Sequence, residues 1–169
     1  MHIAFFRHAE RGPSESSQSA LSKSGLRQAK NLVQWVAEKP MTRTQPARLT
    51  KPERLWTSPK RRTQETFQPL AQALGLRLET RSELDERGDS TILHFQRRIL
   101  AALEELAETN ATVFVCSHLD WLEEAMTLIP DEGSLPIASL SWPPGSFVVF
   151  AIREGRWHSL HQGQVSNDH

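Results

Sequence analysis

The chain has 169 residues, 38% of them hydrophobic, which suits a single globular domain over residues 1–169 with one sizeable core. Its 20 basic and 20 acidic residues cancel, which removes the electrostatic reason to expect nucleic acid or an anionic membrane as the main partner. No apolar run approaches the roughly 18 residues of a membrane span, and the first residues lack the sections of a signal peptide, so we expect a cytoplasmic protein without a membrane partner.

Apolar runs typical of strands alternate with longer segments of helical periodicity, which is the pattern of an α/β fold. In chain order, the first half predicts a strand over His2–Phe6, a helix over Ser22–Glu38, a strand over Arg54–Thr57, a helix over Arg62–Leu74 and a strand over Arg77–Glu79. The second half predicts a helix over Leu93–Glu108, a strand over Thr112–Cys116, a helix over Trp121–Leu128 and a hairpin of strands over Phe147–Ile152 and Arg156–Leu160. The segments Lys39–Pro52 and Pro130–Gly145 predict loops. We therefore expect a three-layer α/β/α sandwich with a mostly parallel central sheet.

Cationic side chains and imidazoles follow three of the predicted strands. Arg7 and His8 come directly after the first strand, Arg62 follows the second, and His118 follows the fourth after a single serine. Because the carboxyl ends of parallel strands meet at one edge of a sheet, we expect these side chains to converge. Guanidinium groups match the oxygens of phosphate in a bidentate manner, so the pattern predicts phosphoryl chemistry.

Five segments strengthen this interpretation: RHAE, LSKSGLRQAKNL, SPKRRTQET, ELDERGD and VCSHLDWL. They occur in the order seen in the histidine phosphatase superfamily, once called the phosphoglycerate mutase-like proteins, and the resemblance covers about residues 3–126. The short chain, RHAE, the Leu21–Gly25 element and the leucine after His118 resemble most closely the SixA-type phosphohistidine phosphatases. The resemblance implies a phosphoglycerate mutase-like fold and a phosphatase that acts on a phosphohistidine protein or a small phosphomonoester.

The resemblance also implies roles for single residues. His8 is the nucleophile that forms a phosphohistidine, which water then hydrolyses. Arg7, Arg62 and His118 bind the equatorial oxygens and oppose the charge that spreads over them in the transition state, His118 thus also counting among the catalytic residues. No metal or other cofactor is expected, because these side chains replace the charge that magnesium supplies in nucleotide kinases.

The proton donor for the leaving group is chosen from the segment SELDERGD. Glu86 is preferred, because mutase-like members carry an acid two residues after a leucine, and Leu84 and Glu86 have that offset. Asp85 and Glu83 remain alternatives. SixA-type proteins often lack a carboxylate here, so its presence in this chain favours phosphate esters to a modest degree.

Other chemistries lack an essential part. A cysteine phosphatase needs an arginine six positions after its nucleophile, yet Leu122 stands there relative to Cys116, the only cysteine. Neither an Asp-x-Asp after a strand nor the G-x-S-x-G and P-loop patterns occur. Two alternatives stay open: a phosphoglycerate mutase-like phosphotransferase, for which the short segment between Arg62 and Glu86 leaves little lid, and a non-catalytic phosphate-binding module. The sequence indicates neither the physiological substrate nor the oligomeric state.

Four further residues are interpreted as parts of the surface. Arg11 and Arg61 are expected to be solvated arginines, with the alternative for Arg11 that it extends the basic mouth of the pocket toward a second charged group of the substrate. His158 and His161 stand three residues apart on a predicted strand, so we expect them to face opposite sides of the sheet and not to form a metal site.

Overall fold

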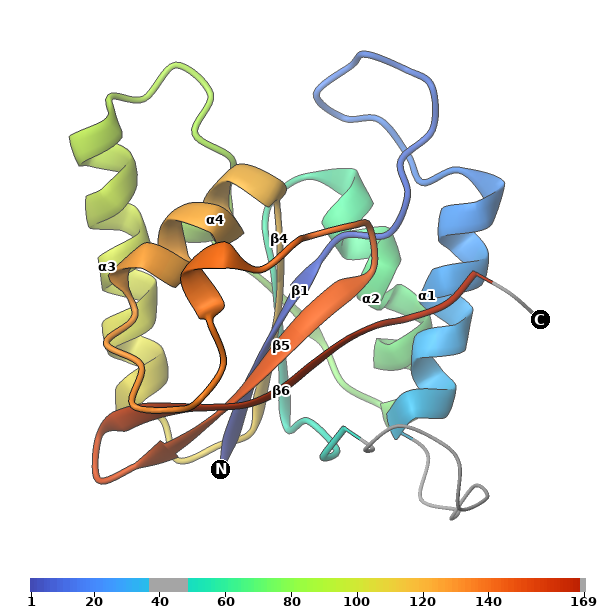
Figure 1. Cartoon of the computed structure of the whole chain (residues 1–169). Coiled ribbons are helices and arrows are strands. Elements are labelled where there is room, and N and C mark those ends of the chain that lie inside the picture. The colour runs from blue at the N-terminus through green and yellow to red at the C-terminus, as the bar shows by residue number, and fades with distance from the viewer. Residues whose placement is uncertain (37–48, 168–169) are drawn as a thin grey trace.

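The computed structural model describes residues 1–36 and 49–167 (Figure 1). The strands are β1 (His2–Arg7), β2 (Arg54–Thr57), β3 (Leu78–Thr80), β4 (Val113–Ser117), β5 (Ser146–Arg153) and β6 (Arg156–Gln164). The helices are α1 (Lys23–Val36), α2 (Arg61–Leu74), α3 (Ile92–Glu108) and α4 (Leu119–Leu128), with short 3-10 turns η1 (Ser82–Leu84) and η2 (Ile137–Ser139). Every predicted strand and helix is therefore present. The end of the first predicted helix and most of the predicted loop Lys39–Pro52 lie outside the described residues.

The six strands form one sheet in the order β3-β2-β4-β1-β5-β6. β1, β2, β3 and β4 run parallel, and only β5 is antiparallel to its two neighbours. β1 and β4 lie in the middle of the sheet, and their burial on both faces explains why their sequences are continuous apolar runs. The predicted mostly parallel sheet is confirmed.

Helices cover both faces of this sheet, as Figure 1 shows. Alternate residues of β1 point to opposite faces, so Phe6 packs with Phe67 of α2 and Leu32 of α1, while Phe5 packs with Trp121 of α4. α3 contributes Phe95 to the same core as Phe5. The α/β/α sandwich is thereby confirmed.

The prediction for the two C-terminal histidines is wrong. The register of β5 and β6 shifts between Val149 and Phe150, so that His158 pairs with Ala151 and His161 with Val149. Val149 and Ala151 lie two residues apart on β5, so His158 and His161 face the same side of the sheet. No group of three or more His, Cys, Asp or Glu residues that could hold a metal ion occurs in the described part of the chain.

None of the described helices is both long enough and apolar enough to cross a membrane.

Candidate active site

Three neighbouring strands end at the upper edge of the sheet in Figure 1. Arg7 ends β1 and pairs in register with Ser117, which ends β4. The next residue on each strand is a histidine, and the backbone N–H of His8 donates to the carbonyl of Ser117 at 3.1 Å. β2 leads through a short turn into α2, whose first turn carries Arg62. The topology thus brings the ends of β1, β2 and β4 together.

A cavity of about 260 Å³ opens at this edge. It is lined by Arg7, His8, Arg11, Arg62, Glu86, His118, Leu119, Asp120 and Glu123. All five residues that the sequence singled out for the site therefore lie around one cavity. The rings of His8 and His118 meet edge to face, with their centroids 5.5 Å apart and their planes inclined by 62°.

His8 is buried, and both its ring and its backbone carbonyl are hydrogen bonded to other parts of the chain. Its Nδ1 donates to the carbonyl oxygen of Ala9 at 2.7 Å, which leaves the lone pair on Nε2. Its backbone carbonyl accepts from the N–H of Gly145 at 3.2 Å. Burial, and then the charges of Arg62 and Arg7, lower the pKa of His8 to about 4, so the ring is neutral near pH 7. A neutral imidazole with a free Nε2 lone pair has the form that a nucleophile needs.

The two arginines are partly engaged by the protein. Arg7 donates from one terminal nitrogen to the carbonyl of Trp142 at 2.6 Å, and Arg62 donates to the carbonyl of Ser17 at 2.9 Å and to Glu86 at 2.8 Å. The Nε atoms of both arginines are buried and have no hydrogen-bond partner among the described residues. A buried guanidinium N–H without an acceptor is costly, so these atoms point to an anion as the missing partner.

His118 caps the N-terminus of α4 and is buried. Its Nδ1 lies 3.2 Å from a terminal nitrogen of Arg62, and its Nε2 lies 2.8 Å from the hydroxyl of Ser58. Burial, followed by the charge of Arg62, lowers the pKa of His118 to about 2. This ring is therefore also neutral near pH 7.

The three candidate acids, Glu86, Asp85 and Glu83, differ in their surroundings. Glu86 lines the cavity and accepts from Arg62. The Asp85 carboxylate accepts from the backbone N–H of Glu86 and lies 3.7 Å from Lys60. The Glu83 carboxylate pairs with Arg81, and this residue is not among those that line the cavity.

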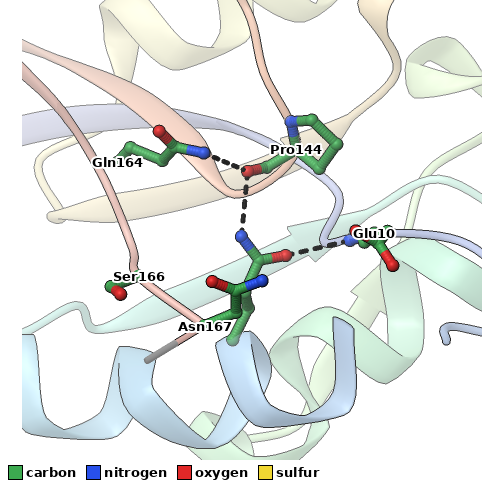
Figure 2. Close-up of a pocket in the computed structure, with 6 residues that line it drawn as sticks. Glu10, Pro144, Gln164, Ser166 and Asn167 are labelled. Atoms are coloured by element: carbon green, nitrogen blue, oxygen red, sulfur yellow. Dashed lines mark hydrogen bonds between the residues drawn. The ribbon is translucent and has the colours of Figure 1, made fainter. Parts of the chain in front are cut away.

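A buried glutamine supports the loop that carries His8. The side chain of Gln28 accepts from the N–H of Glu10 at 3.0 Å and donates to the carbonyls of Pro144 at 3.0 Å and Val165 at 3.1 Å. Gln28 also lines a polar hollow of about 290 Å³. Figure 2 shows Gln164 donating to the same Pro144 carbonyl beside this hollow. Gln28 therefore ties the loop after β1 to the segments that enter β5 and leave β6.

Several residues of the cavity escaped the sequence analysis. Asp120 and Glu123 lie in the first turns of α4, directly after His118, and line the cavity. Arg11 was expected to be solvated; it is exposed and donates to the carbonyl of Ser14, yet it also lines the cavity. Arg61 is exposed and pairs with Glu65, as the surface interpretation had it.

Residues 3–90 match the family model of the histidine phosphatase superfamily, branch 1. No curated protein matches the chain.

Solved structures with the same fold include the protein histidine phosphatase SixA complexed with tungstate, at 20% identity and a TM-score of 0.72, with 99% of this chain and 97% of that chain covered. The alpha-ribazole phosphatase from Shigella flexneri is 17% identical, with a TM-score of 0.70 over 99% of this chain and 96% of that one. YhfR from Bacillus stearothermophilus is 16% identical, with a TM-score of 0.72 and 98% of both chains covered.

Proposed function

Because this chain belongs to the histidine phosphatase superfamily, branch 1, we propose that it hydrolyses a phosphohistidine protein or a small phosphomonoester through a phosphohistidine on His8, without a metal ion. The observation that carries the proposal is the pair of buried, unpartnered Nε atoms of Arg7 and Arg62 beside a neutral His8. A phosphoryl group supplies the anionic oxygens that the guanidinium groups need and the phosphorus atom that the imidazole attacks.

In the first step the Nε2 lone pair of His8 forms a bond to phosphorus, and the bond from phosphorus to the leaving oxygen or nitrogen breaks. The positive charge that develops on the ring is stabilised because Nδ1–H keeps donating to the Ala9 carbonyl. Arg7, Arg62 and His118 bind the phosphoryl oxygens as their negative charge redistributes.

Glu86 is proposed to protonate the leaving group. Its carboxylate accepts from Arg62 at 2.8 Å, so in the proposed step the substrate replaces Glu86 as the partner of that guanidinium and Glu86 turns to the leaving group. In the second step a water attacks phosphorus, Glu86 accepts a proton from it, and the bond between phosphorus and Nε2 breaks. His8 returns to its neutral form.

Two classes of substrate fit this chemistry. The fold shared with the protein histidine phosphatase SixA supports a phosphohistidine protein, and the fold shared with the alpha-ribazole phosphatase supports a small phosphate ester. A mutase is less well supported, because only β3 and the short η1 separate α2 from Glu86 and no lid element lies between them to exclude water.

A turnover panel tests the proposal. Release of phosphate is measured from a phosphohistidine-bearing protein, sugar phosphates, nucleotides and an aryl phosphate, each with and without EDTA. We expect turnover that EDTA leaves unchanged and that His8→Ala abolishes while circular dichroism shows an intact fold. Residual activity of His8→Ala above a small fraction of wild type would contradict the covalent mechanism, and full loss with EDTA would contradict metal independence.

A further inference from the structure

We propose that Ser58 is a positioning residue whose hydroxyl fixes the ring of His118 with its proton on Nε2, so that Nδ1 is the nitrogen offered to the phosphoryl group. The inference rests on the proposed function, because it concerns how one side chain of the same pocket is prepared for phosphate. Ser58 follows β2 directly and is fully buried.

The partners of the His118 ring determine where its proton lies. Nδ1 lies 3.2 Å from a terminal nitrogen of Arg62, and a guanidinium group can only donate. Nδ1 must therefore accept, which places the proton of the neutral ring on Nε2. Nε2 lies 2.8 Å from the Oγ of Ser58, so Nε2–H donates to that hydroxyl.

A second hydroxyl fixes the direction of the first. The Oγ of Ser58 also accepts from the N–H of Lys60 at 3.1 Å and lies 3.0 Å from the Oγ1 of Thr63. Thr63 gives its own proton to the carbonyl of Lys60 at 2.8 Å, so it accepts the proton of Ser58. The chain of donors thus runs from His118 through Ser58 and Thr63 to a backbone carbonyl, and Ser58 has no proton left to offer to the imidazole.

The surroundings of the ring decide what happens when phosphate binds. The charged and titratable groups that face His118 are Arg62 and Lys60 from the start of α2, Arg7 and His8 from the end of β1, and Asp85, whose carboxylate lies 3.9 Å from Nε2. Burial and these cations keep the His118 ring neutral before phosphate binds. Nδ1 of the neutral ring carries a lone pair and can only accept a hydrogen bond. It can bind a phosphate oxygen, which is also an acceptor, only after Nδ1 has gained a proton. Binding of a phosphate dianion should therefore take up about one proton.

Ser58 matters in this step because it accepts from Nε2–H in both the neutral and the charged ring. When phosphate has replaced Nδ1 as the partner of the Arg62 guanidinium, a neutral ring without the Ser58 acceptor could carry its proton on Nδ1 and donate to phosphate with no proton uptake. The hydroxyl of Ser58 therefore couples phosphate binding to protonation of the pocket.

The first experiment measures the tautomer in the intact protein. Ring nitrogen-15 shifts of histidine-labelled protein report which nitrogen carries the proton, and comparison with His118→Gln assigns the signals. Without phosphate we expect the Nε2–H form in wild type, in Ser58→Thr and in Ser58→Ala, because Arg62 still donates to Nδ1. With inorganic phosphate bound we expect a doubly protonated ring in wild type and in Ser58→Thr, and a neutral ring with its proton on Nδ1 in Ser58→Ala. An Nδ1–H ring in phosphate-free wild type, or a doubly protonated ring in phosphate-bound Ser58→Ala, overturns the inference. The wild-type spectrum tests it even if Ser58→Ala does not fold.

The second experiment measures proton uptake. Calorimetric titration with inorganic phosphate at pH 8, in two buffers of different ionisation enthalpy, should show uptake of about one proton by wild type and clearly less by Ser58→Ala. Ser159→Ala is the matched control. Ser159 lies on β6 and is also buried, but it donates to Asp131, and neither residue lines the cavity. No uptake by wild type would overturn the inference.

Kinetics complete the test. Ser58→Ala should lower kcat by roughly 10- to 100-fold, the usual cost of losing a partner that orients a functional histidine, while Ser58→Thr and Ser159→Ala retain activity. Failure of the two proposals can be told apart. A protein with the Nε2–H ring but no turnover on any substrate contradicts the proposed function alone, and an active enzyme with the Nδ1–H ring contradicts the role of Ser58 alone.

Discussion

At the scale of single residues, Arg62 and Arg61 provide a matched pair. Both are arginines in the first turn of α2, but Arg62 is 2% exposed and lines the cavity, whereas the Arg61 side chain is 61% exposed and pairs with Glu65. Lysine keeps the charge but loses the planar fork that binds two oxygens.

We therefore expect Arg62→Lys to lower kcat by roughly 10²- to 10³-fold, the cost of losing one preorganised donor to a transition-state oxyanion. Arg61→Lys should leave kcat unchanged. Steady-state kinetics on one substrate checks both variants. Equal effects of the two substitutions would mean that burial in the cavity does not distinguish the arginines.

The leaving group provides a second prediction at this scale. A general acid matters in proportion to the basicity of the departing atom, so Glu86→Gln should slow hydrolysis of alkyl phosphates by roughly 10²- to 10⁴-fold and affect an aryl phosphate or a phosphohistidine far less. Asp85→Asn is the control, because Asp85 caps the N–H of Glu86 without lining the cavity. Equal losses on every substrate would assign Glu86 to binding, and a selective loss only in Asp85→Asn would make Asp85 the acid.

At the scale of elements, the start of α1 packs closely against the loop after β1, which carries the proposed nucleophile His8. A Cβ on Gly25 would overlap the carbonyl oxygen of Glu10, two residues after His8. The backbone N–H of Ser22 donates to the same carbonyl at 2.9 Å, and the Ser22 hydroxyl donates to the Glu10 side chain at 2.7 Å. The glycine of the L-S-x-x-G element is therefore required for close approach of two backbones.

Gly25→Ala should force α1 and this loop apart, with a loss of about 1–3 kcal/mol in unfolding free energy and a lower kcat, because His8 moves with the loop. Gly75→Ala is the control: Gly75 has φ 66° at the end of α2 and no atom near its Cβ position. That variant should lose about 1–2 kcal/mol of stability and retain kcat. Denaturant unfolding and kinetics on both proteins separate the effects; an unchanged kcat in Gly25→Ala would contradict the coupling.

The elements also show how far a sequence can be interpreted. Long periodic segments predicted every helix and strand, and the rule that strand ends converge brought Arg7, His8, Arg62 and His118 to one cavity. The register shift in β6 could not be predicted, because the glycine of this strand, Gly163, pairs with Phe147 and does not stand at the shift beside Leu160, and this is why the two histidines were assigned to opposite faces. The positions of Asp120 and Glu123 at the cavity, and the hydrogen bonds that link His118 to Ser58 and Thr63, depend on packing between elements distant in sequence. Hydrophobic periodicity does not predict such packing.

At the scale of the whole molecule, the buried histidines make stability depend on pH. Burial lowers the pKa of His8 from its ordinary value of 6.5 to about 4 in the folded chain, and it lowers the pKa of His118 further. Below pH 6.5 the unfolded chain therefore binds protons that the folded chain does not, so the unfolding free energy falls as the pH falls. Each of the two histidines contributes at most about 1.4 kcal/mol per pH unit in this window. The pKa of Glu79 is lowered by its hydrogen bond to Arg54, so its contribution to stability is lost only below its ordinary pKa of 4.5.

Between pH 6.5 and 4.5 the loss of stability should therefore come from histidines. Urea unfolding of wild type across this window should show a clear fall in unfolding free energy. A protein carrying both His8→Asn and His118→Asn should show a shallower fall. The remaining slope is due to His2 and His161, whose pKa values burial also lowers. Phosphate should offset part of the wild-type loss, because it binds only the folded pocket and takes up a proton on binding, and it should not protect the double variant. Identical pH slopes in the two proteins would show that the pocket histidines are not held neutral by the fold, and the neutral nucleophile on which the mechanism depends would then have to be abandoned.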